Sequence, residues 1–156
     1  MMIVEDAVSD VIAKVGAEQR GAGEKVQASA SEDQISAERT VLRDRFRAEM
    51  PTDYARLLSV VNGVDFNGVV LYGAGLTQAS PGAGGFWQGI AEANALWREG
   101  PGHETYLVLG ESDMDLLTVD LDGRRPVLRD KVSSDVFEDF TTVNEAVERL
   151  LRSRLQ

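Results

Sequence analysis

Apolar residues recur at helical spacing in the segment that follows Pro51. Four of them occupy positions i, i+3, i+4 and i+7, which lie along one face of a short helix: Tyr54, Leu57, Leu58 and Val61. Pro51 suits the start of this helix, because its missing N–H falls where a helix has no internal acceptor. Asn62-Gly63 tolerates positive φ and predicts a left-handed cap at the helix end.

A second turn signal follows closely. Asn67-Gly68 also tolerates positive φ, and it precedes the run 69–72, whose valine, leucine and tyrosine side chains favour strands. The segment 51–73 therefore predicts a short helix that reverses through a turn into a strand of a sheet.

The residues before Pro51 carry two further apolar stripes at helical spacing. The stripes lie within 4–15 and 37–50, and each predicts a helix, the second of them terminated by Pro51. Between the stripes, residues 16–34 contain Val26 as the single apolar side chain larger than alanine. Such a segment buries little surface, so we expect a flexible connector there.

The pattern after residue 73 combines helices with short strands. The predicted elements are, in order, a glycine-rich loop at 73–89, a helix at 90–97, strands at 106–109, 116–121 and 127–129, and a helix that begins at the capping box of Thr142 and Glu145 and runs to 151. Asp122-Gly123 predicts a hairpin between the last two strands.

These elements predict an α+β fold: a single domain in which a mainly antiparallel sheet is flanked by helices. The strands are linked by hairpins and show no β-α-β alternation, which argues against a parallel doubly wound sheet. We divide the chain into an N-terminal helical extension at 1–49 and an α+β domain at 50–156.

Charge and composition narrow the function. The chain has 156 residues, 26 acidic against 16 basic, and a formal net charge of −10, which disfavours direct binding of nucleic acid or of anionic membrane surfaces. Cysteine is absent, so disulfides and thiolate chemistry are excluded. Glu5 and Asp6 stand where a secretory signal carries basic residues, and we expect a cytoplasmic protein.

The sequence contains no motif that supports an enzyme site. Gly73-Ala74-Gly75 begins like a phosphate-binding loop, but Gln78 stands where a third glycine is needed and no Gly-Lys-Ser/Thr follows. His103 is interpreted as a solvated loop residue, and no Gly-x-Ser-x-Gly element supplies a nucleophile for it. We therefore predict a protein that is not an enzyme and that takes no cofactor.

Acidic residues gather in two stretches. Five lie within twelve residues and three more surround Phe137: Glu111, Asp113, Asp115, Asp120, Asp122, Asp135, Glu138 and Asp139. Three interpretations stay open, namely solvated strand ends, a surface that faces a partner, and a site for a hard cation. The spacing differs from that of an EF-hand loop, which weighs against the cation.

Two other groups are candidates for contact with proteins. Phe86 and Trp87 lie in the glycine-rich loop, where such aromatic residues either cover the core or meet a partner. Arg39, Arg43 and Arg47 recur along one helical face; they either pair with acidic neighbours or give a dipolar surface that favours self-association into a homo-oligomer.

The chain resembles the SUKH superfamily (Smi/Knr-like proteins), and within it the YrhA-like branch. The resemblance covers about 50–151 and rests on the helix that starts at Pro51, on Asn62-Gly63, and on Phe66-Asn67-Gly68 with the strand after it; further residues agree downstream, namely Ile90 to Asn94 with Trp97, Tyr106 to Gly110, Asp115 to Leu117, Phe137, Phe140 and the closing helix. It implies a SUKH-like α+β domain and, in bacteria, an immunity protein that neutralises a cognate polymorphic toxin by direct binding.

The resemblance and the charge lead to one hypothesis about partners. Toxins that cut nucleic acid carry basic grooves, which an acidic protein can occupy as a phosphate mimic. The eight acidic residues of the two stretches, with Phe86 and Trp87, are the predicted partner-binding residues. The alternatives are a regulatory or scaffold module of the cell-wall-regulator type and a metal-dependent hydrolase that uses Asp113, Asp115, Asp120 and Asp122.

Overall fold

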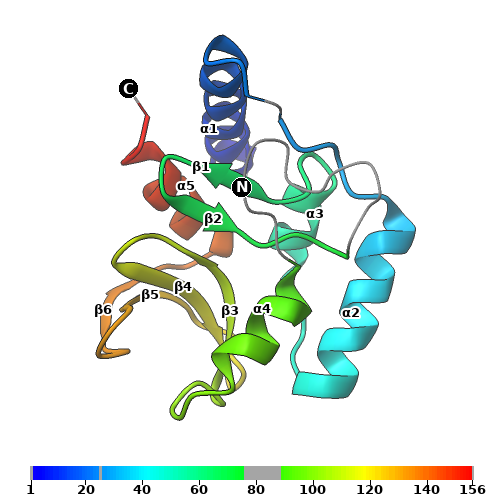
Figure 1. Cartoon of the computed structure of the whole chain (residues 1–156), viewed down its shortest axis with the longest axis vertical. Coiled ribbons are helices and arrows are strands. Elements are labelled where there is room, and N and C mark those ends of the chain that lie inside the picture. Colours follow the sequence, from blue (N-terminus) through cyan, green and yellow to red (C-terminus); the bar gives the residue numbers. More distant parts are fainter. Residues whose placement is uncertain (1, 25, 76–88, 156) are drawn as a thin grey trace.

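The computed structural model describes residues 2–24, 26–75 and 89–155, which form an α+β fold (Figure 1). The described helices are α1 (Met2–Gly21), α2 (Glu32–Phe46), α3 (Thr52–Leu58), α4 (Ile90–Trp97) and α5 (Val143–Arg152). The described strands are β1 (Val64–Phe66), β2 (Val69–Leu71), β3 (Tyr106–Glu111), β4 (Asp115–Asp120), β5 (Pro126–Asp130) and β6 (Val136–Asp139). The predicted fold class, a single α+β domain with helices around an antiparallel sheet, is confirmed.

The described strands form one six-stranded sheet in which neighbours in the chain are also neighbours in space. Their order is β1-β2-β3-β4-β5-β6, and each adjacent pair is antiparallel. The hairpin predicted at Asp122-Gly123 joins β4 to β5 and is confirmed. This order leaves β1 and β6 as the two edges of the sheet.

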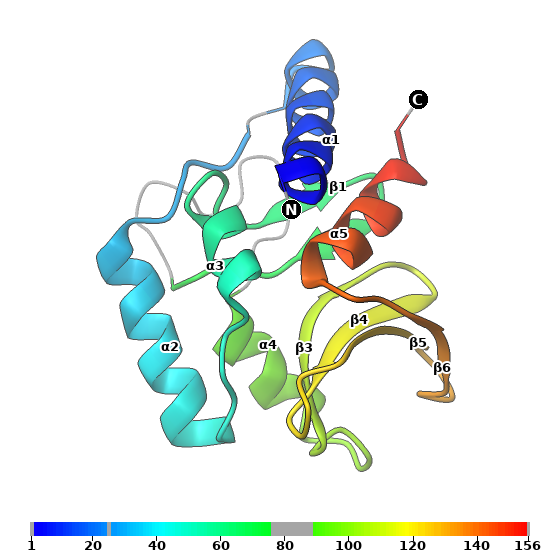
Figure 2. The same cartoon turned by 180° about the vertical axis from the view of Figure 1, so that it is seen from behind.

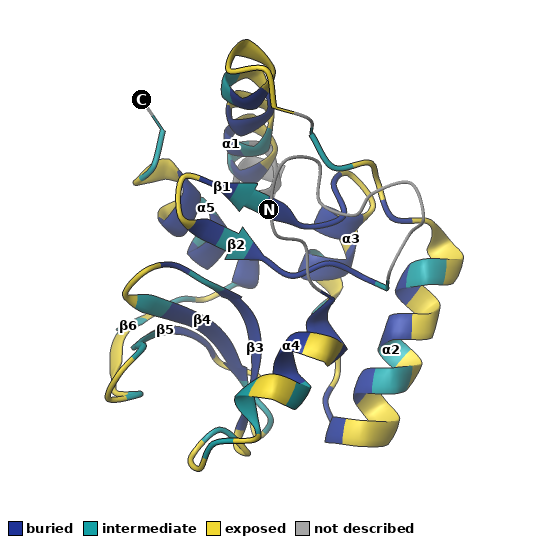
Figure 3. Ribbon diagram, in the orientation of Figure 1, coloured by how far each residue is buried: buried dark blue, intermediate teal, exposed yellow. Residues whose placement is uncertain are grey.

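Helices cover the sheet from several sides. Helix α5 packs on β4 and β5 and also contacts α3, while α1 packs along α5 (Figure 2). Helix α4 packs on β3, and α2 packs on α4. The buried residues follow these contacts, since the faces of the helices that point to the sheet are buried and the opposite faces are exposed (Figure 3).

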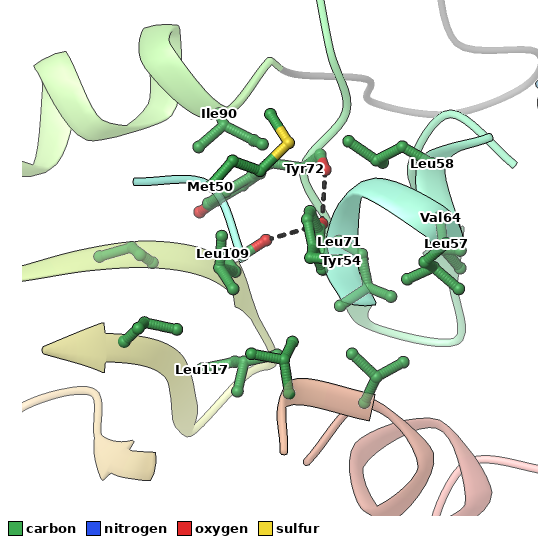
Figure 4. Close-up of a cluster of buried hydrophobic side chains, with 14 of the residues drawn as sticks. Met50, Tyr54, Leu57, Leu58, Val64, Leu71, Tyr72, Ile90, Leu109 and Leu117 are labelled. Carbon is green, nitrogen blue, oxygen red and sulfur yellow. Dashed lines mark hydrogen bonds between the residues drawn. The ribbon is translucent and has the colours of Figure 1, made fainter. Parts of the chain in front are cut away.

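The core at α3 is organised by the fully buried Tyr54. Its side chain lies among apolar groups from α3, β2 and β3 (Figure 4). Its hydroxyl donates to the carbonyl oxygen of Tyr72 at 2.5 Å and contacts that of Leu109 at 3.2 Å. Helix α3 begins directly after Pro51, as predicted. The Tyr54 hydroxyl links the residue after β2 to the middle of β3.

The end of α3 differs from the prediction. The helix stops at Leu58 and does not reach Asn62-Gly63, although Val61 is still buried. The backbone N–H of Asn62 donates to the carbonyl of Ala28 at 2.8 Å, so the chain leaves the helix to meet the connector. Gly63, with φ of 92°, therefore turns the chain after the helix and does not cap it.

The turn predicted at Asn67-Gly68 is present, with φ of 48° and 86°. It joins β1 to β2, in which Phe66 pairs with Val69. The sequence predicted β2 but not β1. A three-residue strand is too short for a periodicity argument, although an Asn-Gly pair between apolar residues is itself a hairpin signal.

The N-terminal helices have other bounds than predicted. Helix α1 continues to Gly21, and α2 begins at Glu32 after a capping box made by Ser31 and Gln34. Residues 22–31 join them, so the connector is shorter than the predicted 16–34. Polar capping groups, which an apolar stripe does not register, set the start of α2.

Helix α2 also ends earlier than predicted. Arg47 adopts a left-handed conformation with φ of 54°, and its N–H donates to the carbonyl of Arg43. The residues after it are no longer helical, which lets Ala48 and Met50 point into the core. Pro51 therefore does not terminate this helix; a left-handed residue four positions earlier does.

The C-terminal half contains one strand that the sequence did not predict, β6. Three of its four residues are exposed and two are acidic, so the segment shows no alternation of buried and exposed positions. Helix α5 has the predicted capping box: the Thr142 hydroxyl accepts from the Glu145 N–H at 3.2 Å, and the Glu145 carboxylate accepts from the Thr142 N–H at 3.0 Å. The apolar face of α5 is buried, as its stripe predicted.

Candidate binding surface

A side-chain amide bonds to the backbone of β3 beyond the residues that pair with its neighbour strand. Strand β2 pairs with β3 at Glu111 and Gly110, and just after β2 the Tyr72 N–H donates to the Leu109 carbonyl at 2.9 Å. The adjacent residue of β3, Val108, bonds instead to Asn94 of α4. The buried Asn94 amide accepts from the Val108 N–H and donates to the Val108 carbonyl, both at 2.8 Å. The amide thereby replaces the peptide group of a strand and fixes α4 against the sheet.

A second amide does the same at the end of β2. The Asn62 side chain accepts from the N–H of Ala74 at 2.7 Å and donates to its carbonyl at 3.3 Å. Asn62 is buried, so these bonds satisfy polar groups that have no access to water.

Glu38 of α2 is a buried carboxylate that binds two backbone groups. Its oxygens accept from the Gly75 N–H at 2.9 Å and from the Ala91 N–H, in the first turn of α4, at 2.8 Å. Burial raises the pKa of Glu38; the two backbone bonds oppose this rise, and the charge of Glu92 adds to it. Glu38 joins α2 to the segment that follows β2 and to α4, which is a structural role.

Glu111 belongs to a network at the end of β3. The Tyr72 hydroxyl donates to Glu111 at 2.5 Å, and the Lys131 ammonium lies 2.6 Å from the other carboxylate oxygen. The Trp97 indole N–H donates to the Tyr72 hydroxyl at 3.0 Å. Burial and the bond to Glu111 raise the pKa of the Tyr72 phenol. Both carboxylate oxygens of Glu111 are therefore bound by groups from other segments of the chain.

Asp120 belongs to a second network, at the opposite end of β4. Its carboxylate lies 2.9 Å from the Arg129 guanidinium and 3.5 Å from that of Arg125. Arg129 also stacks 4.1 Å from the centre of the Tyr106 ring. These contacts hold Asp120 against its own sheet.

His103 is not the solvated loop residue that the sequence suggested. Its Nδ1 lies 2.6 Å from the Tyr106 hydroxyl, and its half-buried ring packs edge-on against Trp97 and Tyr106. The two aromatic residues that contact it lie six positions before and three positions after it in the chain, and the neighbouring glycines alone do not indicate these contacts. It is a packing residue between α4 and β3.

Three further acidic candidates pair with arginines at the surface. Asp113 lies 2.6 Å from Arg154, and this contact lowers the pKa of Asp113. The other two pairs are longer, Asp139 to Arg125 at 3.3 Å and Glu138 to Arg149 at 3.5 Å. Exposed pairs of this kind contribute little to stability.

The last three acidic candidates make no ion pair with the described residues. Asp122 is exposed in the turn between β4 and β5, and Asp135 is exposed just before β6. Asp115 is half-buried and sits opposite Asp130 across the β4–β5 pair. Phe86 and Trp87 lie outside the described residues.

The eight acidic residues therefore do not converge on one site. Glu111, Asp113 and Asp115 lie at one end of the β3–β4 hairpin and Asp120 and Asp122 at the other. The remaining three, Asp135, Glu138 and Asp139, lie at or next to β6. Within the described residues, no three histidine, cysteine, aspartate or glutamate side chains are grouped to hold a metal ion. The four carboxylates of the hydrolase alternative are divided between the two ends of the hairpin.

Exposed apolar residues lie beside these carboxylates, and none of them was among the predicted partner-binding residues. Val132 is 95 % exposed, Met114 64 %, Phe137 53 % and Val136 36 %. The backbone N–H of Lys131 donates to the carbonyl of Met114 at 2.8 Å, so the two turns that carry Met114 and Val132 adjoin. The sequence signal that could have indicated these residues is the presence of apolar side chains within an acidic run. We call these four residues the β6 patch.

Comparisons with known proteins add no identity to the α+β fold. No protein-family model matches the chain. No curated protein is significantly similar to it. None of the helices within residues 2–24, 26–75 and 89–155 has the length and apolar character that crossing a membrane requires.

Proposed function

We propose that this chain is a non-enzymatic binding protein of the SUKH type that neutralises a cognate bacterial toxin domain by direct contact in the cytoplasm. The observation that carries the proposal is the β6 patch, in which Met114, Val132, Val136 and Phe137 are exposed next to carboxylates. Apolar side chains gathered on a surface are typical of sites where proteins bind one another.

Charge supports a basic partner. The formal net charge of −10 creates a long-range attraction for a basic surface, such as the substrate groove of a nuclease toxin. Asp122 and Asp135 are exposed and make no ion pair with the described residues, so they are available to cations of a partner. The resemblance around Pro51 to Gly73 is the reason for naming a toxin as that partner.

The direct test is co-expression of this chain with the toxin domain encoded beside its gene. We expect rescue of growth and a complex that survives co-purification. The association rate is expected to fall steeply between 50 mM and 500 mM salt, because salt screens the attraction. Absence of both rescue and a complex would refute the proposed function, and a rate insensitive to salt would refute its electrostatic part.

A further inference from the structure

We infer that the free edge of β6 binds an extended, basic segment of a partner protein as an additional antiparallel strand. The inference rests on the proposed function for the identity of that partner, but its physical basis is the edge itself. In the described sheet β6 pairs only with β5, so one side of its backbone has no strand beside it. An open edge of this kind is a template for another strand.

The backbone of β6 presents hydrogen-bonding groups outward. The Phe140 N–H donates to the Pro126 carbonyl at 3.0 Å and thus points toward β5. Successive residues of a strand point their backbone groups to alternate sides, so the N–H and carbonyl of Asp139 point away from β5. These two groups are where an added strand would bond.

A bulge at Phe137 gives the edge an apolar contact. Leu128 pairs with Glu138 and Arg129 pairs with Val136, which leaves Phe137 as the extra residue of β6. Its ring is 53 % exposed, and Val132 at the preceding turn is 95 % exposed. A partner strand with an apolar residue opposite Phe137 would cover its ring.

Charge decides between a second copy of this chain and a different, basic partner. If two β6 strands paired antiparallel about Phe137, Asp135 of one copy would face Asp139 of the other. Like charges directly opposite each other destabilise a strand pair. A strand carrying lysine or arginine would instead pair with Asp135, and it would compete with Arg125 for Asp139, whose present pair is exposed and 3.3 Å long. The edge therefore favours a basic segment.

The test measures binding of the adjacent toxin domain to the whole chain by calorimetry. Phe137→Ser and Asp135→Lys are each expected to weaken binding at least tenfold. Val60→Ser is the matched control, because Val60 is 63 % exposed but lies at the end of α3, away from β6. Exchange of the Asp139 amide hydrogen is expected to slow at least tenfold in the complex.

The outcomes separate this inference from the proposed function. If the toxin domain binds wild type and Phe137→Ser equally and exchange at the Asp139 amide does not change, strand addition at β6 is refuted. The proposed function is then unaffected. If the toxin domain does not bind, an acetylated octapeptide of alternating lysine and valine serves as the probe. If this peptide slows exchange at the Asp139 amide and a glutamate-valine peptide does not, strand addition at β6 is supported without the proposed function. If neither peptide changes the exchange, strand addition at β6 is wrong. Dimerisation abolished by Phe137→Ser overturns the choice of a basic partner.

Discussion

Replacing Asn94 removes the side chain that stands in for a strand beside β3. The variant Asn94→Leu keeps the size of the side chain but has no donor or acceptor. It leaves the N–H and the carbonyl of Val108 without the partners they have at 2.8 Å. Both groups are buried, since Asn94 and Val108 are 1 % and 0 % exposed, so water does not replace the lost bonds.

The magnitude follows from these two groups. A buried backbone group left without a partner costs about 1–3 kcal/mol, so we expect Asn94→Leu to lower the free energy of unfolding by about 2–6 kcal/mol. A domain of this size is stable by about 5–15 kcal/mol, so a loss near the lower end of the expected range leaves a folded variant and a loss near the upper end can unfold it. Urea unfolding followed by circular dichroism measures the difference.

A charge variant separates hydrogen bonding from packing. Asn94→Asp keeps the acceptor for the Val108 N–H but turns a carboxylate toward the Val108 carbonyl. Burial and this carbonyl favour the protonated acid, so the pKa of the new carboxyl lies higher in the folded than in the unfolded chain. The folded state then binds the extra proton, and the deficit relative to wild type shrinks as pH falls from 7 through that folded pKa.

The control and the refuting result concern the same helix. Leu96 is 58 % exposed two residues further along α4, and Leu96→Gln is expected to change stability by less than about 0.5 kcal/mol. If Asn94→Leu costs no more than Leu96→Gln, Asn94 does not complete the sheet as described.

Two other substitutions test close contacts and burial. Gly110→Ala would place its Cβ 2.7 Å from the Val70 carbonyl and 2.8 Å from Leu71, so overpacking between β2 and β3 is expected to cost about 1–3 kcal/mol in urea unfolding; an unchanged midpoint would show that the strands separate freely. Burial raises the pKa of Glu38 above its unfolded value, so the folded state takes up a proton first and wild type should gain stability relative to Glu38→Gln as pH falls from 7 through the folded pKa. Melting temperatures of both proteins across that range check this, and a difference that is constant or moves the other way would contradict it.

The sequence predicted the elements that have a local cause. The stripe at Tyr54, Leu57 and Leu58 became the buried face of α3, and Thr142 with Glu145 capped α5. The turn at Asn67-Gly68 formed for the same reason, since its residues accept positive φ. In each case neighbouring residues determine the conformation, so a single sequence contains enough information.

The missed features depend on residues far apart in the chain. Strand β6 exists because β5 lies beside it, and its exposed acidic residues carry no periodic signal. Asn62, Asn94 and Glu38 are polar residues within helical or turn patterns, and their importance follows from backbone groups that folding places near them. No local pattern reports such partners.

The acidic candidates show the same limit and sharpen the expected mode of binding. Glu111, Asp113 and Asp120 each meet a cation from another segment: Lys131, Arg154, and Arg125 with Arg129. Ion pairing leaves the net charge of −10 unchanged, so the long-range attraction for a basic partner persists. Ion pairing does, however, occupy the carboxylates that a phosphate mimic would present to the groove of its partner. Specific contact with a partner is therefore expected from the unpaired acids and the apolar residues along β6, while the remaining charge acts mainly on the rate of encounter.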